Sequence, residues 1–276
     1  MKARHPYPLI AAGFLSLLFC VAAGPPAPYH WRTSFEIQGV EDDASGITWS
    51  PVTQHLYVVI DGPERVVELT TEGKTVRQVK LKGFDDTEGI CHIREHLFAV
   101  IEENEMTITF VDLSPGVLSV SAKDKRVIRV APPLPKEDKS GLEGISYDAA
   151  SDTLFVVKEA EPKAVYIIRE ACTDNPVITP APELLRATEK LEDLSDVLFA
   201  ADEKCLYIVS DRSKALTRMQ LDGTIIDHLS LRGGNLGLNK TIKDAEGVTR
   251  DDRGNLYICS EPRHINVFTP ASPGKP

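Results

Sequence analysis

The sequence predicts an all-β fold: a five-bladed β-propeller of four-stranded antiparallel blades, closed by the N-terminal strand. One pattern, an acidic loop followed by an apolar strand, a tight turn and a second apolar strand, occurs five times along the 276 residues. The anchor positions of the copies lie 43 to 55 residues apart, which is the period of propeller blades rather than of solenoid turns. The second strand of each copy is apolar at successive positions, as expected for a strand buried on both faces between neighbouring blades. The anchors are Gly46, Gly89, Gly144, Asp196 and Gly247.

The N-terminal segment 1–23 has the layout of a targeting sequence. Lys2 and Arg4 precede an apolar run from Leu9 to Ala23, and the small residues at its end favour cleavage after Ala23. An uncleaved anchor and a lipoprotein signal at Cys20 are the alternatives, although the run is short for a membrane span, which needs about 20 apolar residues. All three predict an exported domain, in the periplasm or at the outer face of the inner membrane.

The rest of the chain divides into a linker over residues 24–33, the propeller over residues 34–268 and a flexible tail over residues 269–276. Ser34–Gln38 precedes the first copy and has no blade of its own, and the fifth copy ends after Ile265–Phe268 without an outer strand. We expect Ser34–Gln38 to complete the last blade, because closing the ring removes exposed sheet edges.

Two insertions interrupt the repeat. Ala131–Asp138 is rich in proline and is therefore predicted to be a loop. Ala171–Lys190 is the second, and Pro182 within it favours the start of a short helix.

Composition limits the partners. With 42% hydrophobic residues the chain can bury a full-sized core, and its formal net charge is −10. Nucleic acids and anionic lipid head groups attract basic surfaces, so no nucleic acid is expected among the partners. Cations, and neutral or basic ligands, are favoured instead.

Four of the five cysteines follow the targeting segment, and they do not form a zinc motif. None has Cys-x-x-Cys spacing or a paired histidine. Cys91 and Cys259 lie in apolar strands and are predicted to be small core residues. A disulfide between Cys172 and Cys205 remains open, because sequence does not show proximity.

Acidic residues recur at two places in the repeat. At the start of the inner strand, Glu88, Glu143 and Glu246 stand directly before the anchor, and Asp43, Asp86, Asp193 and Asp244 stand three residues before it. Just past the apolar run of the next strand, the acids are Asp61, Glu102, Glu159, Asp211 and Glu261. The start of one strand and the end of the next lie at the same edge of an antiparallel sheet, so both sets are expected at one mouth of the central channel.

These acids predict a metal site. Crowded carboxylates repel one another unless some are protonated or a cation binds, and oxygen ligands without His or thiolate suit calcium or magnesium. The predicted ligands, with the most regular copies first, are Glu143, Glu246, Glu159, Glu261, Glu88, Glu102, Asp61 and Asp211. The alternative is that these acids cap turns and accept backbone N–H bonds.

Catalytic patterns are weaker, and the chain is predicted to be non-enzymatic rather than a hydrolase. It contains no Gly-x-Ser-x-Gly elbow, and Ser195 and Ser210 have no base visible in the sequence. His92 lies in an inner strand, where the other copies have packing residues, and His264 lies next to an acidic loop. These two are the histidine candidates for a general base.

Several motifs, taken in this order, resemble a known family. They are Asp43-x-Ser45-Gly46-Ile47-Thr48-Trp49, Gly83-Phe84-x-Asp86-x-Glu88-Gly89-Ile90, Leu142-Glu143-Gly144-Ile145-Ser146-Tyr147, Lys158-Glu159-x-x-Pro162, Leu206-x-Ile208-x-Ser210-Asp211 and Glu246-Gly247 with Ser260-Glu261-Pro262. Over roughly Ser34 to Phe268 the chain is similar to the SdiA-regulated, YjiK-like proteins of bacteria. The resemblance implies a calcium-binding, five-bladed propeller distantly similar to NHL repeats, with an N-terminal signal or membrane anchor, and it implies no reaction.

The resemblance and the acidic repeat together favour one function and leave two alternatives. The favoured function is an exported propeller whose acidic channel mouth holds a divalent cation, calcium, and which binds a small molecule or protein partner. The first alternative is a calcium-dependent hydrolase similar to lactonases and esterases. The second is a protein-interaction scaffold without metal. Ser45, Ser195 and Asp196 depart from the repeat, so the acidic ring is expected to be lopsided.

Overall fold

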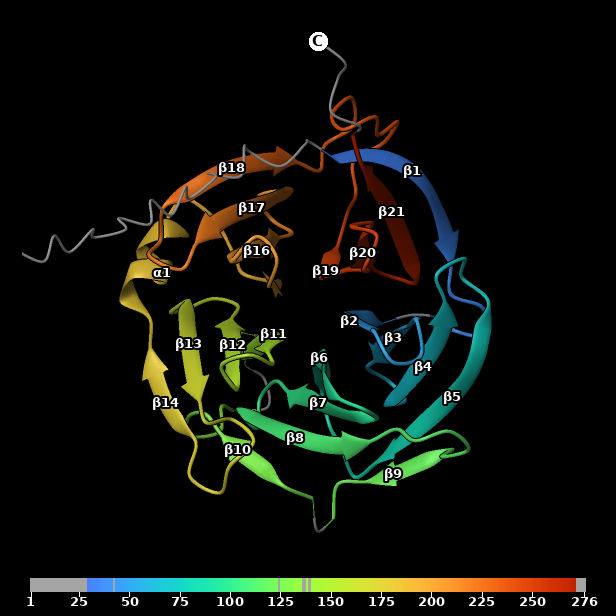
Figure 1. The fold of residues 1–276 in the computed structure, drawn as a ribbon, viewed down its shortest axis with the longest axis vertical. Coiled ribbons are helices and arrows are strands. Elements are labelled where there is room, and N and C mark those ends of the chain that lie inside the picture. The colour runs from blue at the N-terminus through green and yellow to red at the C-terminus, as the bar shows by residue number, and fades with distance from the viewer. Residues whose placement is uncertain (1–28, 42, 124, 136–137, 139, 272–276) are drawn as a thin grey trace, which may run out of the picture.

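The computed structural model describes residues 29–41, 43–123, 125–135, 138 and 140–271, and these form a ring of five antiparallel blades (Figure 1). Blade 1 contains β2 (Ala44–Ser50), β3 (His55–Ile60), β4 (Arg65–Thr70) and β5 (Thr75–Lys82). Blade 2 contains β6 (Thr87–Arg94), β7 (Leu97–Glu102), β8 (Thr107–Asp112) and β10 (Val127–Arg129). Blade 3 contains β11 (Leu142–Asp148), β12 (Thr153–Lys158), β13 (Ala164–Arg169) and β14 (Val177–Pro180). Blade 4 contains β15 (Asp196–Ala200), β16 (Cys205–Ser210), β17 (Ala215–Gln220) and β18 (Ile225–Ser230).

The N-terminal strand completes blade 5, as predicted. This blade runs from β19 (Ala245–Arg250) through β20 (Leu256–Ser260) and β21 (His264–Pro270) to β1 (Tyr29–Glu36) at its outer edge. The predicted boundaries were too narrow at both ends. β1 begins at Tyr29, within the predicted linker, and β21 continues through Pro270, into the predicted tail.

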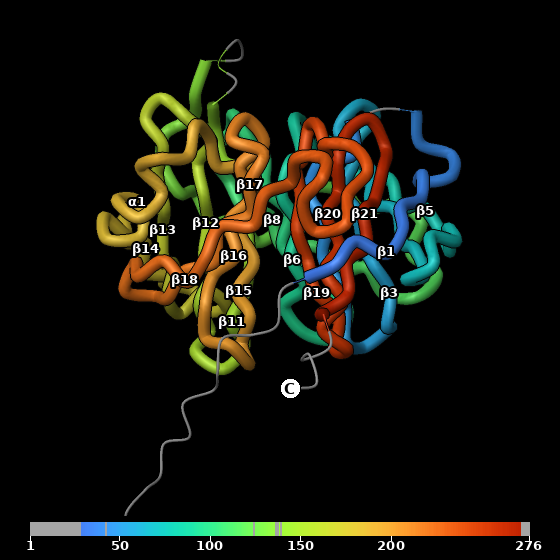
Figure 2. The backbone as a smooth tube through the Cα atoms, turned by 90° about the horizontal axis from the view of Figure 1, so that it is seen from above, coloured from blue at the N-terminus to red at the C-terminus, as the bar shows by residue number. Residues whose placement is uncertain are grey.

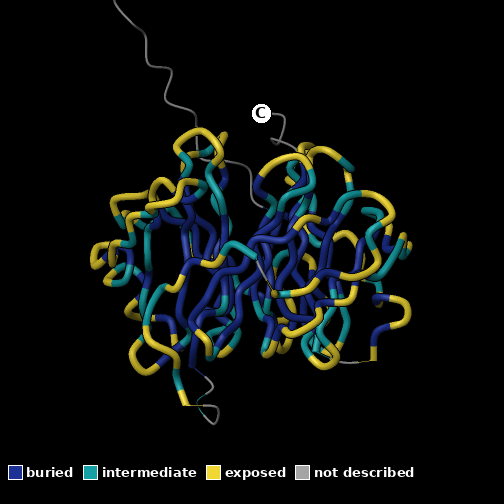
Figure 3. Tube along the Cα trace, turned by 90° about the horizontal axis from the view of Figure 1, so that it is seen from below, coloured by how far each residue is buried: buried dark blue, intermediate teal, exposed yellow. Residues whose placement is uncertain are grey.

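The core consists of five apolar clusters, one at each interface between neighbouring blades. Successive side chains of a second strand enter different clusters, because they point to opposite faces of the sheet. In β3, Leu56 and Val58 pack against blade 5, whereas Tyr57 and Val59 pack against blade 2. Each fully buried aliphatic side chain contributes roughly 1.5–3 kcal/mol. Figure 2 shows the blades side by side from another direction, coloured along the chain. The buried residues follow the strands and the exposed ones follow the loops at both ends of the ring (Figure 3).

Of three further features, one was predicted from the sequence, one was missed and one differs from a pairing that the sequence left open. The predicted helix is α1 (Pro182–Ala187). An unpredicted strand, β9 (Ser119–Ser121), leaves the insertion after β8 and pairs in parallel with β5 of blade 1. The disulfide between Cys172 and Cys205 does not form, since all four described cysteines are free thiols.

The targeting segment 1–23 lies outside the described residues. Within the part of the chain that is described, no helix has the length and apolar character needed to cross a membrane.

Candidate metal centre

At four of the five anchors the inner strands approach one another so closely that only glycine fits. A Cβ added at Gly46 would lie 2.5 Å from the carbonyl oxygen of Glu88, and one added at Gly89 would lie 2.4 Å from that of Glu143. Both distances are well inside van der Waals contact. The glycines therefore bring the start of each inner strand against the next, and with it the acidic residue that precedes the anchor.

Asp196 takes the place of the fourth glycine and bridges neighbouring blades. Its carboxylate accepts hydrogen bonds from the backbone N–H groups of Val197 and Val248, both at 2.7 Å. The side chain is buried, and burial raises the pKa of Asp196 well above its usual range. The departure from the repeat is thus a connection between blades 4 and 5.

The strand register corrects one predicted ligand. Ile47 pairs with Val58 in blade 1, and Ile90 pairs with Val100 in blade 2. Counting three residues onward from each partner gives Asp61 in blade 1 but Glu103, not Glu102, in blade 2. Glu102 instead accepts hydrogen bonds from Thr109 Oγ1 at 3.0 Å and from the backbone of Asp85 at 3.3 Å, so its carboxylate is used within and beside blade 2. We call the acids at this equivalent position the outer acid set: Asp61, Glu103, Glu159, Asp211 and Glu261.

Members of this outer acid set connect one blade to the next. Glu103 Oε1 accepts the N–H of Gly141 at 2.7 Å, and Asp211 Oδ1 accepts that of Ala245 at 2.9 Å. The N–H of Thr87 bonds Asp61 in the same way. Acceptance of backbone N–H bonds, the alternative to metal binding, therefore explains in part why an acid recurs at this position.

The aspartates three residues before the anchor recur for a backbone reason. Asp43, Asp86 and Asp244 have φ angles of 61°, 60° and 50°. Asp and Asn adopt this left-handed conformation more readily than most residues. Their recurrence alone thus indicates a turn, although the Asp86 carboxylate also lies among other acids.

The glutamates directly before the anchors are the residues that capping does not explain. Glu88, Glu143 and Glu246 are half-buried at the start of β6, β11 and β19. Burial, and then the negative charges of neighbouring acids, raise the pKa of Glu88 and Glu143 well above the usual range and that of Glu246 to about 8. Such groups lose part of their charge at neutral pH unless a cation is supplied.

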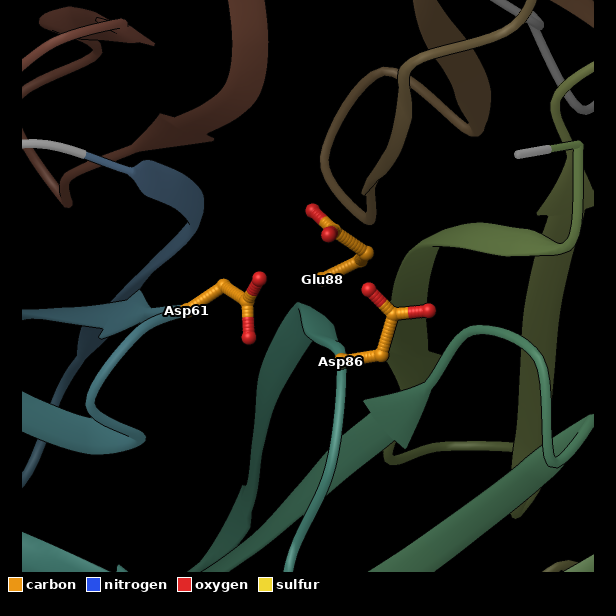
Figure 4. A group of neighbouring side chains, drawn as sticks. All are labelled: Asp61, Asp86 and Glu88. Carbon is orange, nitrogen blue, oxygen red and sulfur yellow. The ribbon is translucent and has the colours of Figure 1, made fainter. Parts of the chain in front are cut away.

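The first group of converging acids consists of Asp61, Asp86 and Glu88. One carboxylate oxygen of each lies within 4.8 Å of the others. Figure 4 shows the three side chains pointing towards a common space between the turn after β3 and the start of β6. Burial and the charge of Asp86 raise the pKa of Asp61 to about 6. Among the described residues, no lysine or arginine forms an ion pair with any of the three. We call these residues the first acid group.

Asn104 lies beside the first acid group with an unpaired oxygen. Its amide nitrogen donates to Asp86 Oδ2 at 2.6 Å, while its Oδ1 is buried and has no hydrogen-bond partner. Asn104, Asp61 and Asp86 line the same pocket of about 300 Å³. A side-chain oxygen without a partner therefore belongs to a residue that contacts Asp86 of the first acid group.

The second acid group consists of Glu103, Glu143 and Glu159, again with one oxygen of each within 4.8 Å. Here the protein supplies positive charge. Arg212 Nη2 bonds Glu159 Oε1 at 2.7 Å, and the buried Lys158 ammonium donates to the carbonyls of Ser140 and Ala160 beside the group. Burial, together with the charge of Asp86, still raises the pKa of Glu103 to about 7.

The structure does not place the other predicted ligands in either acid group. Asp211 is paired with Lys214 at 2.6 Å. Glu246 and Glu261 repel each other electrostatically at the blade 5 side of the channel. Of the eight predicted ligands, the structure brings Asp61 together with Glu88 and Glu143 together with Glu159, and it adds Asp86 and Glu103.

Neither histidine candidate is part of an acid group. His92 lies near the far end of β6 from Glu88, with its Nε2 2.9 Å from the Glu95 carbonyl and its ring against Phe98. Burial lowers the pKa of His92. His264 lies 3.6 Å from Glu36 of β1. His92 therefore has the packing role that its position in the repeat predicted.

The fold and the channel define a class: a five-bladed β-propeller with converging carboxylates at one mouth. The model of the SdiA-regulated family matches residues 24–269, so the chain belongs to the SdiA-regulated family.

Two solved structures of similar fold are a chain of a nidogen/laminin complex and a luciferin-regenerating enzyme. The first is 13% identical with a TM-score of 0.52, and covers 79% of this chain and 72% of its own. The second is 14% identical with a TM-score of 0.51, and covers 83% of this chain and 73% of its own. At these identities the similarity shows the fold alone.

Proposed function

We propose that this protein is an exported or periplasm-facing propeller that binds one divalent cation, calcium, at the first acid group, and acts as a binding module for a small molecule or protein. The observation that carries the proposal is the convergence of Asp61, Asp86 and Glu88 without a positive side chain. Three carboxylates within 4.8 Å of one another repel strongly in a half-buried site, and a bound cation would reverse this repulsion.

The donor set favours calcium over transition metals. The first acid group offers only oxygen atoms, and the unpaired Asn104 oxygen lies beside it. Calcium takes six to eight oxygen ligands with flexible geometry, whereas zinc and copper favour His and Cys. Carboxylates from the turn after β3 and from β6 would hold the ion across the interface of blades 1 and 2. The ion would thereby stabilise the ring as well as offer coordination positions to a ligand.

The export part of the proposal rests on segment 1–23. Its charged start, apolar run and small residues are the features of a signal peptide or anchor. Extracytoplasmic calcium concentrations suit weak sites of the extracellular class, with Kd values of about 10⁻⁴–10⁻³ M.

Calcium titration of the purified protein by calorimetry, with melting scans in calcium and in chelator, tests the proposal. We expect one bound ion per chain and a higher melting temperature in calcium, because a ligand that binds only the folded state stabilises it by mass action. Magnesium serves as the competing ion. No heat of binding and equal melting temperatures in calcium and chelator would reject the proposal, and the acids would then serve blade connection alone.

A further inference from the structure

Blade 5 contains a polar side chain whose amide is used by no described residue. Asn266 of β21 is 9% exposed, and its side-chain amide makes no hydrogen bond to any described residue. Its amide atoms remain accessible, because neither is a fully buried atom without a partner, and the residue lines a groove. The amide is therefore available to a ligand.

The equivalent positions of the other blades show that Asn266 is exceptional. The strand register equates it with Val67, Thr109, Tyr166 and Thr217. Thr109 donates to Glu102 at 3.0 Å, and Thr217 bonds His228 of its outer strand at 2.8 Å. In blade 5 the cross-strand neighbour of Asn266 is Ser34 of β1, and no hydrogen bond joins them. Where blades 2 and 4 satisfy the polar group at this position, blade 5 leaves it free.

The amide lies at a groove of about 900 Å³ between blade 5 and the loop that joins β18 to β19. Side chains that line the groove include Trp31, Ser34, Lys240, Lys243, His264 and Asn266. The indole N–H of Trp31 is buried without a partner. Neither lysine forms an ion pair among the described residues. Glu261 also lines the groove, so its lining carries two lysines and one glutamate in a chain with a net charge of −10.

The loop that forms one wall is held in place, so the groove is formed in the absence of a ligand. Leu238 and Ile242 are buried in the cluster between blades 4 and 5. The N–H of Trp31 donates to the carbonyl of Leu236 at 2.6 Å, and the ring of His30 lies against Gly237. A wall fixed by these contacts lowers the entropic cost of binding.

We infer that this groove binds a small acidic sugar, a polyhydroxylated ring that carries a carboxylate. The Asn266 amide offers a donor and an acceptor side by side, which matches neighbouring hydroxyl groups. The indole of Trp31 offers an apolar face for the carbon side of the ring, and the two lysines attract the carboxylate. A volume of about 900 Å³ lies within the usual range of ligand pockets.

The inference does not depend on the proposed calcium site. None of the first acid group lines the groove, and Glu261 is the one member of the outer acid set that does. Sugar binding is therefore expected to persist in chelator. Loss of calcium binding with retained sugar binding would reject the proposed function alone, and the reverse result would reject this inference alone.

The test is calorimetric titration of the full chain with glucuronate, with and without chelator, alongside the variants Asn266→Val and Asn266→Thr. Val and Thr are the residues that blades 1, 2 and 4 carry at this position, so both variants are expected to fold. We expect saturable binding by the natural chain and at least a tenfold loss in Asn266→Val.

Two further measurements sharpen the test. Lys243→Gln is expected to weaken glucuronate binding while leaving the weaker binding of uncharged glucose unchanged. Absence of saturable glucuronate binding to the natural chain, or unchanged binding in Asn266→Val, would overturn the inference. A lower melting temperature for Asn266→Val would also overturn it, because it would show that the amide serves the fold.

Discussion

The two acid groups are built from the same repeat but differ in what balances their charge. In the first acid group, at the interface of blades 1 and 2, no arginine or lysine of the described chain pairs with Asp61, Asp86 or Glu88. In the second, at the interface of blades 2 and 3, Arg212 reaches across from blade 4 to Glu159 at 2.7 Å. The first acid group has no such counter-charge among the described residues, whereas the second is partly neutralised by a cation that the fold supplies. A carboxylate cluster is therefore judged by its counter-charges as much as by its spacing.

The largest expected effect is a difference in calcium affinity between variants of Glu88 and of Glu246, its equivalent in blade 5. Glu88→Gln removes one of three charges from the first acid group and is expected to weaken calcium binding at least about tenfold, or 1.4 kcal/mol. Glu246→Gln is the matched control, since Glu246 holds the same position in blade 5 outside both groups. Calorimetry measures both. An equal loss in the two variants would show that the ring acts as one diffuse charge rather than through the first acid group.

The next effect concerns the number of bound ions. Arg212→Gln removes the guanidinium from Glu159 and is expected to raise the calcium stoichiometry from one to two, because the second acid group then lacks its paired cation. Lys214→Gln is the control, since Lys214 pairs with Asp211, which belongs to neither group. Calorimetry and metal analysis after desalting give the stoichiometry. If natural protein already binds two ions, Arg212 does not make the difference between the groups.

A smaller effect is expected in the pH dependence of stability without calcium. Folding raises the pKa of Asp61 from 3.8 to about 6, of Glu103 from 4.5 to about 7 and of Glu246 from 4.5 to about 8. The folded state therefore holds more protons than the unfolded state between about pH 4 and pH 8, and stability falls as pH rises through this window. Melting scans in chelator should show this fall, and saturating calcium should reduce it. A rise in melting temperature from pH 5 to pH 8 in chelator would contradict these shifts.

The smallest expected effect tests the corrected register. Glu102 bonds Thr109 within blade 2, so Glu102→Gln is expected to leave the affinity and stoichiometry of calcium unchanged within about 0.5 kcal/mol. Glu103→Gln, one residue later, alters the second acid group and is expected to reduce the second binding event of the Arg212→Gln background. Calorimetry on Glu102→Gln and on the double variant Arg212→Gln/Glu103→Gln measures both effects. A loss of calcium affinity in Glu102→Gln alone would restore the ligand that the sequence pattern predicted.

The fold could be predicted from sequence because its requirements are local and repeated. The anchor glycines are needed where inner strands meet, and the second strands are apolar on both faces because each lies between two clusters. The short strand β9 was missed because it has three residues and pairs with a strand of another blade. The start of β1 was missed because only Tyr29, which is buried, and Trp31, which is half-buried, stand among exposed polar residues there.

The site could be predicted only in part. The apolar run of β7 places Glu102 at its end, but the pairing of β6 with β7 shifts between His92 and Arg94, and this irregularity moves Glu103 into the equivalent position. The pairing of Arg212 with Glu159 joins residues 53 positions apart, so no local pattern reveals it. Asp43 and Asp86 serve turns with positive φ, and Asp211 accepts a hydrogen bond from the backbone of the next blade. Neither role can be read from the amino-acid sequence, because both depend on the backbone conformation.

The pairing of β1 with β21 sets the order in which this protein can be completed. The first strand of the ring is made about 230 residues before its partner, since β1 ends at Glu36 and β21 begins at His264. While the chain is synthesised, β1 has no partner, and the ring can close only after the last strand has emerged. A chain shortened before β21 would leave β1 unpaired and the edge of β20 exposed, which favours aggregation. Completion of the ring therefore depends on β21, and a stop codon just before His264 should be as damaging as one in the middle of the propeller.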